Sequence, residues 1–540
     1  MRRDLDRLAG ERFDVLVVGG GIHGAAAARE AAARGLRTAL IERGDFGHAT
    51  SANSLRIIHG GLRYLQHGDL AKIRDSVRAR RGILRRFPHL AAPLPCVLPT
   101  RGLGTRGRPA MALALGLYDL LSADRNDGVA PPCRIPRGRV IGLAELQQRA
   151  PNLAAPRASG GALWHDGIAL DAERLVLELA LDADAAGAAV ANYVRAEGFL
   201  RGGRRIEGVS ARDAAGGREL LIRAAVTIDA TGPWLGEMWR REEVRSGAPA
   251  LAKAVNVIVG RPIFSDTAVG VEASGGGRLF FFVPWRGATM IGTAYLPHHG
   301  SPDDCAVSAR DLEELVREIN RIHPAARIVP EEVRLAHAGL LPLDPRAGGA
   351  ASVEARLLRR PRVLDAARET GLEGLVGIEG IKYTTGMTVG ARAVDLAAAK
   401  LGRAGRAAVP GAPAVPEPPD EPLGVDPALA ARLHRTYGAA AAALIRDLAG
   451  SGEHARRITE DQPTTAAEVL HAARAEMAST LADVVLRRTP LGTCGHPGMA
   501  ALSRCAGILG AELGWDAARQ ELEIAGVEEH YRRFAGRIAP

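Results

Sequence analysis

Three glycines follow one another at the spacing GxGxxG: Gly19, Gly21 and Gly24. Each position suits a different requirement of a nucleotide diphosphate site. Gly19 permits a tight turn, Gly21 lets the backbone approach a pyrophosphate, and Gly24 allows a helix to pack closely on a strand. A helix that begins here also points free N–H groups and a positive dipole end at the phosphates. The motif therefore predicts a dinucleotide site.

The stretches around these glycines are the elements that such a site needs. The apolar run FDVLVVG (13–19) predicts a strand buried on both faces, and the alanine-rich residues 24–34 predict a helix. A second strand is expected at RTALIE (37–42), which completes a βαβ unit of about 30 residues. Glu42 ends that strand, where its carboxylate can accept hydrogen bonds from a ribose diol.

Two later segments favour FAD over NAD as the dinucleotide. A strand at 228–234 runs into Ala230, Thr231 and Gly232, and GIEGIKYTTGMT (377–388) opens a helix expected to reach about Lys400. A second helix N-terminus at the far end of the cofactor suits the electron-rich N1/C2=O edge of a reduced flavin. We expect this FAD to be bound non-covalently.

Ten stretches, in order along the chain, match those of a known family. They are SANSLRIIHGGLRYLQ (51–66), GLYDLL (116–121), DAERLVLELA (171–180), ATGPW (230–234), FFVPW (281–285), IGT (291–293), AGLLPL (338–343), KYTT (382–385), HAARAEMASTLADVVLRRTPL (471–491) and ELGWD (512–516). On these residues the chain resembles the FAD-dependent glycerol-3-phosphate dehydrogenase family of the aerobic, quinone-linked type. The resemblance implies that a secondary alcohol beside a phosphate is oxidised to the ketone, as to dihydroxyacetone phosphate. A hydride passes to flavin N5 and the electrons pass to quinone.

The resemblance also implies the residues that contact the cofactor and the substrate. The family grips its substrate phosphate with basic residues that correspond here to Arg63, Arg360 and Lys382, and Tyr64 belongs to the same substrate site. A phosphate dianion calls for two or three convergent cations. Without the resemblance, Arg63 and Arg360 would be solvated surface arginines. The implied cofactor contacts are Gly19, Gly21, Gly24, Glu42, Thr50, Ser51, Thr231, Gly232, Gly380, Thr384 and Thr385.

The other end of the substrate site departs from the family pattern. Asn256 stands at the catalytic position where the family has a histidine, and an amide cannot act as a general base near neutral pH. Leu341 replaces an arginine able to stabilise a developing alkoxide. Tyr295 replaces an acid, and Met387 replaces a further arginine. These changes leave open whether the substrate is glycerol 3-phosphate or a close phosphorylated relative.

His59 is the remaining candidate for the catalytic base. It lies in IIHGGLRY, the loop that the family lays against the flavin, where an imidazole can take the hydroxyl proton as hydride leaves. The alternative is a histidine satisfied by backbone bonds and packing beside the cofactor. Tyr295 and Tyr383 are weaker candidates because a phenol has a pKa near 10. No metal site is expected, since Cys494 and His496 have no further ligands nearby in the sequence.

The composition limits the partners and the compartment. The five cysteines are scattered and form no CxxC, which indicates a reducing compartment. The net charge of +9 comes from 66 arginines and 4 lysines without any nucleic-acid-binding motif, so we expect no nucleic-acid partner. The longest apolar run, residues 110–121, is too short for a membrane span, and the N-terminus lacks a signal-peptide core. These features predict a cytoplasmic protein.

Peripheral contact with the inner face of the cell membrane is an alternative that the charge pattern leaves open. Residues 56–86 hold nine arginines or lysines, and four of these recur at helical spacing: Arg74, Arg78, Arg81 and Arg85. They predict either a solvated helix face or contact with anionic lipid headgroups. The sequence does not fix the oligomeric state, and a homodimer is one option.

The predicted fold class is α/β with an additional helical domain. A discontinuous Rossmann-type FAD-binding domain carries an inserted mixed-sheet substrate domain. Five prolines between Pro413 and Pro422 predict a stiff linker, and an all-helical domain follows it. The predicted boundaries are 12–100, 160–240 and 345–403 for the FAD-binding domain, 101–159 and 241–344 for the substrate domain, 404–423 for the linker, and 424–540 for the helical domain.

Three functions remain open from the sequence. The first is an FAD-dependent dehydrogenase of the glycerol-3-phosphate type. The second is a flavin oxidase or dehydrogenase of the same fold that acts on a different hydroxy or amino substrate. The third is a non-catalytic flavoprotein that binds a partner or ligand without turnover.

Overall fold

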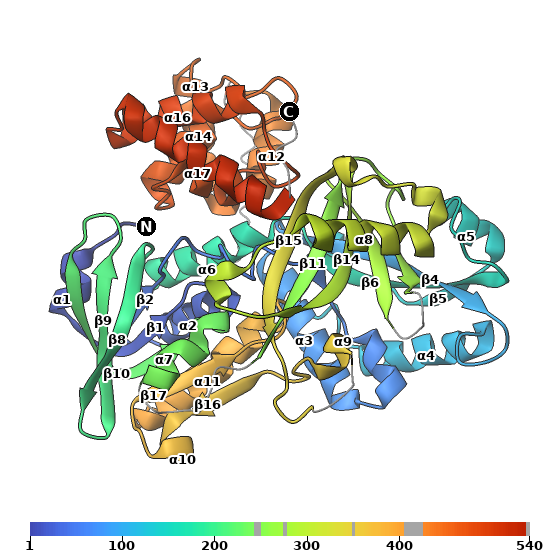
Figure 1. Cartoon of the computed structure of the whole chain (residues 1–540), viewed down its shortest axis with the longest axis horizontal. Helices are drawn as coiled ribbons and strands as arrows, with labels where there is room; N and C mark the ends of the chain where they lie inside the picture. The colour runs from blue at the N-terminus through green and yellow to red at the C-terminus, as the bar shows by residue number, and fades with distance from the viewer. Residues whose placement is uncertain (242–249, 274–277, 348–351, 404–424, 536–540) are drawn as a thin grey trace.

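The computed structural model describes residues 1–241, 250–273, 278–347, 352–403 and 425–535. Two β-sheets lie side by side, and a group of helices from the end of the chain lies across one side of both (Figure 1). The first sheet has eight strands and the second has nine. This arrangement confirms the predicted fold class.

The first sheet is built around the predicted βαβ unit. Its strands follow the order β16-β17-β10-β1-β2-β7, and β8 and β9 continue it beyond β10 as an antiparallel extension. The pairs β1–β10, β1–β2, β2–β7 and β10–β17 are all parallel, as the buried apolar run at β1 predicted. The strands are β1 (Arg12–Val18), β2 (Thr38–Ile41), β7 (Ala189–Ala191), β8 (Val194–Gly202), β9 (Arg205–Asp213), β10 (Glu219–Asp229), β16 (Arg362–Asp365) and β17 (Leu375–Glu379).

Helix α2 (Ile22–Ala33) follows β1 directly and is the central helix of this half. It packs against α11 (Gly386–Lys400) and α6 (Ala172–Ala185). Its alanines make this close approach possible, because Ala25, Ala27, Ala28 and Ala31 are all fully buried. Helix α2, whose N-terminus belongs to the predicted dinucleotide site, is therefore held in place by α6 and α11. Short helices α1 (Leu5–Gly10), α7 (Leu235–Arg241) and α10 (Ala366–Thr370) complete this half.

The second sheet is mixed and takes strands from distant parts of the chain. Its order is β15-β11-β14-β13-β12-β4-β6-β3, with β5 paired to β6. Three of these strands, β3, β4 and β6, lie wholly or largely in segments that the sequence-based boundaries assigned to FAD binding. The domain boundaries themselves stay a prediction. The strands are β3 (Ile57–Ile58), β4 (Ala91–Arg101), β5 (Arg139–Ile141), β6 (Ala158–Ala169), β11 (Leu251–Val259), β12 (Ala268–Glu272), β13 (Leu279–Trp285), β14 (Ala288–His298) and β15 (Val333–Pro342).

Five helices within the described ranges pack on or around the second sheet. Helix α8 (Ala309–Ile322) buries Leu312, Leu315 and Ile319 in a cluster with the strands. Helices α3 (Leu70–Arg86), α4 (Arg108–Leu121), α5 (Leu143–Arg149) and α9 (Val353–Arg356) lie around the sheet's other side and end (Figure 1). In the described residues no helix is both long enough and apolar enough to cross a bilayer.

The end of the chain is helical, as predicted. A cluster that includes Leu481, Leu502 and Tyr531 forms its core and continues into the second sheet. The predicted linker at 404–423 lies outside the described residues. The helices are α12 (Pro427–Tyr437), α13 (Ala441–Gly450), α14 (Ala466–Ala475), α15 (Leu481–Asp483), α16 (Met499–Leu513) and α17 (Ala517–Ala535), with a π-turn at Val484–Arg488.

Candidate functional site

One cavity of about 1740 Å³ is lined by residues from both sheets. It collects nearly all the residues that the sequence predicted for the cofactor and the substrate. Gly24 and Thr385 are the two exceptions. The predicted residues that line it are Gly19, Gly21, Glu42, Thr50, Ser51, His59, Arg63, Tyr64, Thr231, Gly232, Asn256, Arg360, Gly380, Lys382 and Thr384.

The three glycines of the fingerprint have different local reasons to be glycine. Gly19 has φ +105°, a conformation that L side chains rarely adopt, and a Cβ there would lie 2.7 Å from the Ala230 carbonyl oxygen. A Cβ on Gly24 would lie 1.8 Å from the Gly19 oxygen, so Gly24 serves packing behind the turn. A Cβ on Gly21 would meet only Ser51 Oγ, at 3.3 Å. The protein therefore leaves open space at Gly21, which fits a pyrophosphate above it.

Backbone N–H groups hold the Glu42 carboxylate beside the glycine turn (residues 19–24). Its two carboxylate oxygens accept hydrogen bonds from the N–H groups of Gly20 (2.6 Å) and Gly44 (2.8 Å). Ser51 Oγ accepts a bond of 3.0 Å from the Ile22 N–H in the first turn of α2. The Glu42 carboxylate and the N-terminus of α2 thus both face the cavity, an arrangement that suits a ribose diol and a phosphate.

Threonines link the predicted cofactor segments to each other and to the second sheet. Thr50 Oγ1 bonds both the N–H and the carbonyl of Leu340 on β15, at 3.1 and 3.2 Å. Thr384 Oγ1 accepts the N–H of His59 at 3.1 Å. Thr231 donates to Asp229, whose pKa burial raises to about 6. Thr385 lies outside the cavity as the residue before α11, and its hydroxyl donates back to the Lys382 carbonyl.

A buried carboxylate lies behind His59, at a position that the sequence did not mark as functional. Asp166, on β6, is 5% exposed, and its Oδ2 lies 3.7 Å from His59 Nδ1. The Gly60 N–H and the Arg80 guanidinium also bond its Oδ1, at 2.6 and 2.8 Å. Burial acts to raise the pKa of Asp166, but nearby His59 and Arg80 lower it to about 2. The His59 ring is half-exposed toward the cavity, so it combines an open face with an ionised carboxylate at its back.

Five cations line the substrate end of the cavity, and two of them lie against the ring of Tyr64. The ammonium groups of Lys72 and Lys382 lie 4.1 and 4.3 Å from the centre of its ring. Arg63 pairs with Glu354 at 2.9 Å, and Arg360 pairs with Asp69 at 2.8 Å. The five cations are Arg63, Lys72, Arg359, Arg360 and Lys382, and all of them line the cavity together with these two carboxylates.

The surroundings of both lysines in this cluster disfavour their protonated, charged form. Burial, with a smaller contribution from Arg63, lowers the pKa of Lys382 to about 8. Burial also lowers the pKa of Lys72, where the attraction of Asp69 is opposed by Arg360, Arg359 and Arg63. An excess of partly desolvated positive charge in a cavity is relieved when an anion binds. Lys72 gave no signal in the sequence, because only the fold brings α3 beside the loop of Lys382.

The residues that depart from the family pattern fall into two groups. Asn256, Tyr295 and Leu341 line the cavity, whereas Met387 packs against an apolar cluster outside it. Asn256 is buried, and its Oδ1 accepts a bond of 2.8 Å from Thr293. Burial raises the pKa of Tyr295, which disqualifies it further as a base.

Arg278 is a cavity cation that the sequence analysis overlooked. Its guanidinium lies 4.6 Å from the centre of the Phe280 ring. Its Nε is buried and has no hydrogen-bond partner among the described residues. It directly precedes β13 and acts electrostatically on Tyr295, so a cation is present near this altered position.

Two of the four arginines on the predicted basic helix face are paired with a carboxylate, whereas Arg78 and Arg85 are exposed. Arg74 and Arg81 both pair with Asp124, at 2.5 and 2.7 Å. Elsewhere in the stretch 56–86, Arg56 and Arg80 are buried in ion pairs with Glu173 and Asp166. The stretch therefore presents much less free positive charge than its composition predicted.

The glycine cradle and the large cavity between the sheets define an oxidoreductase with a dinucleotide cofactor. Comparison with known proteins supports this class and specifies it. Residues 14–396 match the family model described as FAD dependent oxidoreductase, and residues 388–520 match the C-terminal domain of alpha-glycerophosphate oxidase. A glycerol-3-phosphate dehydrogenase from Synechocystis sp. is 31% identical over 98% of both chains. The chain therefore belongs to the FAD-dependent glycerol-3-phosphate dehydrogenase family, and its cofactor is FAD.

Other relatives agree with this assignment. The mitochondrial glycerol-3-phosphate dehydrogenase of Bos taurus is 30% identical over 95% of this chain and 72% of its own. An alpha-glycerophosphate oxidase of Streptococcus pyogenes serotype M1 is 33% identical over 63% of this chain and 56% of its own. The crystal structure of glycerol-3-phosphate dehydrogenase from Bacillus halodurans with FAD shares the fold, with a TM-score of 0.75 and 21% identity over 98% of this chain and 97% of that chain.

Proposed function

We propose that the protein oxidises glycerol 3-phosphate, or a close phosphorylated alcohol, to the corresponding ketone. The observation that carries this proposal is the group of five cations that line the same cavity as the glycine cradle and His59, two of them against the ring of Tyr64. A neutral alcohol or a zwitterionic amino acid gives no reason for two partly desolvated lysines beside three arginines. A phosphate dianion does, because several cations can each form a charge-assisted bond to its oxygens.

In this proposal the chain binds the substrate at one end and removes a proton at the other. Lys382 and Lys72, which lie against the Tyr64 ring, contact the phosphate. Arg63 and Arg360 exchange part of their contact with Glu354 and Asp69 for a contact with it. The carbinol then lies toward His59. Bound FAD supplies the acceptor for the hydride.

His59 takes the hydroxyl proton at the imidazole nitrogen that faces the cavity. The Asp166 carboxylate lies 3.7 Å from the other ring nitrogen, Nδ1, and its negative charge stabilises the imidazolium that forms. Asn256 cannot replace this base, because its amide accepts from Thr293 and has no basic lone pair. Arg63 and Arg278 both supply positive charge near Tyr295, at the altered end of the cavity.

We propose quinone as the electron acceptor and a bilayer as the surface on which it is met. Helix α4 lines the cavity with Met111 and Ala114, yet its opposite face leaves Leu113 and Leu120 exposed by 76% and 73%. An apolar stripe on a helix that also borders the active cavity fits the interfacial layer of a membrane. Exposed Arg78, Arg85 and Arg108 lie on the same two helices, α3 and α4, and suit anionic headgroups.

A vesicle experiment tests the membrane proposal. Replacing both Leu113 and Leu120 by glutamate should reduce binding to phosphatidylglycerol vesicles and turnover with vesicle-borne quinone, while turnover with a soluble dye stays unchanged. Leu522→Glu is the matched control, since Leu522 is 63% exposed on α17, away from the cavity. Equal vesicle binding by all three proteins would count against α4 as the contact.

A different hydroxy or amino substrate is the second candidate, and the altered residues Asn256 and Leu341 favour it. Turnover over a substrate panel separates the two functions. We expect kcat/KM to be highest for glycerol 3-phosphate or another phosphorylated secondary alcohol, and at least 100-fold lower for glycerol and for amino acids. A higher value for an unphosphorylated substrate supports the second candidate. Comparing quinone with oxygen as acceptor distinguishes dehydrogenase from oxidase.

A further inference from the structure

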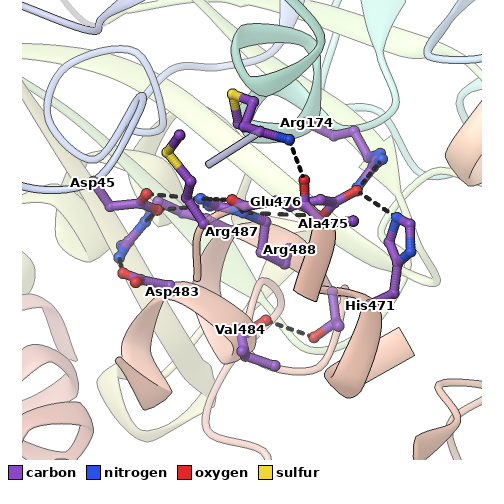
Figure 2. A network of polar contacts seen from close by, with 12 residues as sticks. Asp45, Arg174, His471, Ala475, Glu476, Asp483, Val484, Arg487 and Arg488 are labelled. Carbon is purple, nitrogen blue, oxygen red and sulfur yellow. Dashed lines mark hydrogen bonds and ion pairs between the residues drawn. The ribbon is translucent and has the colours of Figure 1, made fainter. Parts of the chain in front are cut away.

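The helical end of the chain contacts the back of the cofactor cradle through buried charges. Arg487 and Arg488, in the π-turn Val484–Arg488, reach Asp45 in the loop that follows β2 (Figure 2). Arg488 binds both oxygens of the Asp45 carboxylate, at 2.6 and 2.7 Å, and Arg487 Nε binds Oδ2 at 2.6 Å. Asn192 donates a fourth bond, of 3.1 Å. Asp45 is 1% exposed, so all of this charge is removed from water.

The loop held in this way is a wall of the adenosine site. Residues 42–48 form it, and they bring Glu42 and His48 into the cavity lining. The Gly44 N–H binds the Glu42 carboxylate at 2.8 Å, and the Asp45 carbonyl bonds the His48 ring at 2.8 Å. The Gly47 N–H bonds the carbonyl of Gly20 in the phosphate turn at 3.0 Å. A shift of Asp45 therefore moves both the ribose carboxylate and the phosphate turn.

The two arginines are themselves fixed from the helical side. Arg487 also binds Asp483 at 2.7 Å, and Arg488 binds the carbonyl of Glu476 at 3.0 Å. The Glu476 carboxylate lies next to this group and binds Arg174 of α6 at 2.6 Å. Figure 2 shows this second ion pair beside the first, with His471 against Glu476. Contacts within the helical domain therefore fix the positions of both guanidinium groups.

No residue of the described part of 425–535 lines the cavity. Buried ion pairs add little net stability compared with apolar packing, and their best-supported value is that they select one geometry. Arg487 and Arg488 reach the loop whose Gly44 N–H binds Glu42, so the geometry that they select includes this part of the cavity lining.

We propose that Arg487 and Arg488 are positioning residues for FAD. By holding Asp45, they fix the Glu42–His48 loop, so that the affinity for the adenosine half of FAD depends on docking of the helical domain. This inference rests on FAD as the cofactor and is independent of the proposed substrate.

The test compares Arg487→Lys and Arg488→Lys with Arg432→Lys. Each lysine keeps the charge but loses the two-pronged contact of the guanidinium. Arg432 is the matched control, because it binds both oxygens of buried Glu468 within the helical domain, at 2.8 and 2.6 Å, and does not touch the loop. For each apo-protein, the dissociation constants of FAD and of ADP are measured, together with the unfolding temperature.

We expect Arg487→Lys and Arg488→Lys to raise both dissociation constants roughly 5- to 20-fold, since part of a charge-assisted contact is transmitted to the site. Arg432→Lys should lower the unfolding temperature and leave both constants within about twofold of the wild-type values. Unchanged FAD and ADP binding in the two loop-contacting variants would show the interface to be purely structural. If a variant folds only with FAD, the FAD release rate of the holo-protein is compared with that of the control, and equal rates overturn the proposal.

Discussion

Lys382 gives the sharpest quantitative prediction, because its charge is poised to be lost within an accessible pH range. Its pKa is lowered from 10.5 to about 8 by burial and by Arg63. Burial disfavours the charged form of Lys382 before substrate binds. The free enzyme therefore loses this proton as the pH rises through 8. At pH 9 about nine-tenths of the free protein carries neutral Lys382. Phosphate binds the charged form, so substrate affinity should fall about tenfold between pH 7 and pH 9.

Replacing Lys382 by methionine removes the charge and keeps a side chain of similar length. At pH 7 we expect KM for the phosphorylated substrate to rise about 10- to 150-fold, the loss of one charge-assisted bond to a buried anion of about 1.5–3 kcal/mol. In the variant, KM for the phosphorylated substrate should no longer change with the protonation of residue 382. The ratio of variant to wild-type KM should therefore shrink about tenfold from pH 7 to pH 9.

The assay is steady-state turnover with a soluble dye acceptor at both pH values. Lys400→Met is the control, since Lys400 pairs with Asp365 at 2.7 Å and does not line the cavity. A KM ratio that stays constant between pH 7 and pH 9, or a variant indistinguishable from the control, would refute the assignment of Lys382 to the phosphate.

Other substitutions separate the cofactor cradle, the base and the altered end of the cavity. Gly21→Val should abolish FAD binding while the apo-protein stays folded, whereas Gly24→Val should prevent folding, as circular dichroism and flavin absorbance would show. His59→Gln should lower kcat by about 10²- to 10⁴-fold with FAD affinity unchanged, and a loss of less than tenfold would exclude it as the base. Arg278→Leu should lower kcat/KM for the phosphorylated substrate about tenfold without loss of FAD, because it removes a cation from the altered end. An unchanged kcat/KM would remove Arg278 from the site.

The local part of the fold could be predicted from the sequence, and the long-range part could not. The GxGxxG turn, β1, β2 and α2 follow from short-range pattern, since glycine conformation and apolar periodicity act within about 30 residues. The second sheet joins β4 to β6 and β12, partners far apart in the chain. No periodicity encodes such pairings, which explains why three of its strands fell into segments assigned to FAD binding.

The site shows the same division. Lys382 and His59 stand in recognisable segments, and both line the cavity. Asp166 and Lys72 had no such mark, because a carboxylate on a strand and a lysine on a basic helix are ordinary until the fold places them beside His59 and Tyr64. The grip of the helical domain on Asp45 was equally invisible, since its partners are more than 440 residues away in the chain.

Anaerobic mixing of the purified FAD-loaded protein with glycerol 3-phosphate, and separately with glycerol, tests the central claim most directly. We predict that glycerol 3-phosphate bleaches the flavin absorbance band stoichiometrically and yields dihydroxyacetone phosphate, while glycerol at the same concentration leaves the band unchanged. A band that persists at saturating glycerol 3-phosphate, or that bleaches equally with glycerol, would contradict oxidation of a phosphorylated alcohol in this cavity.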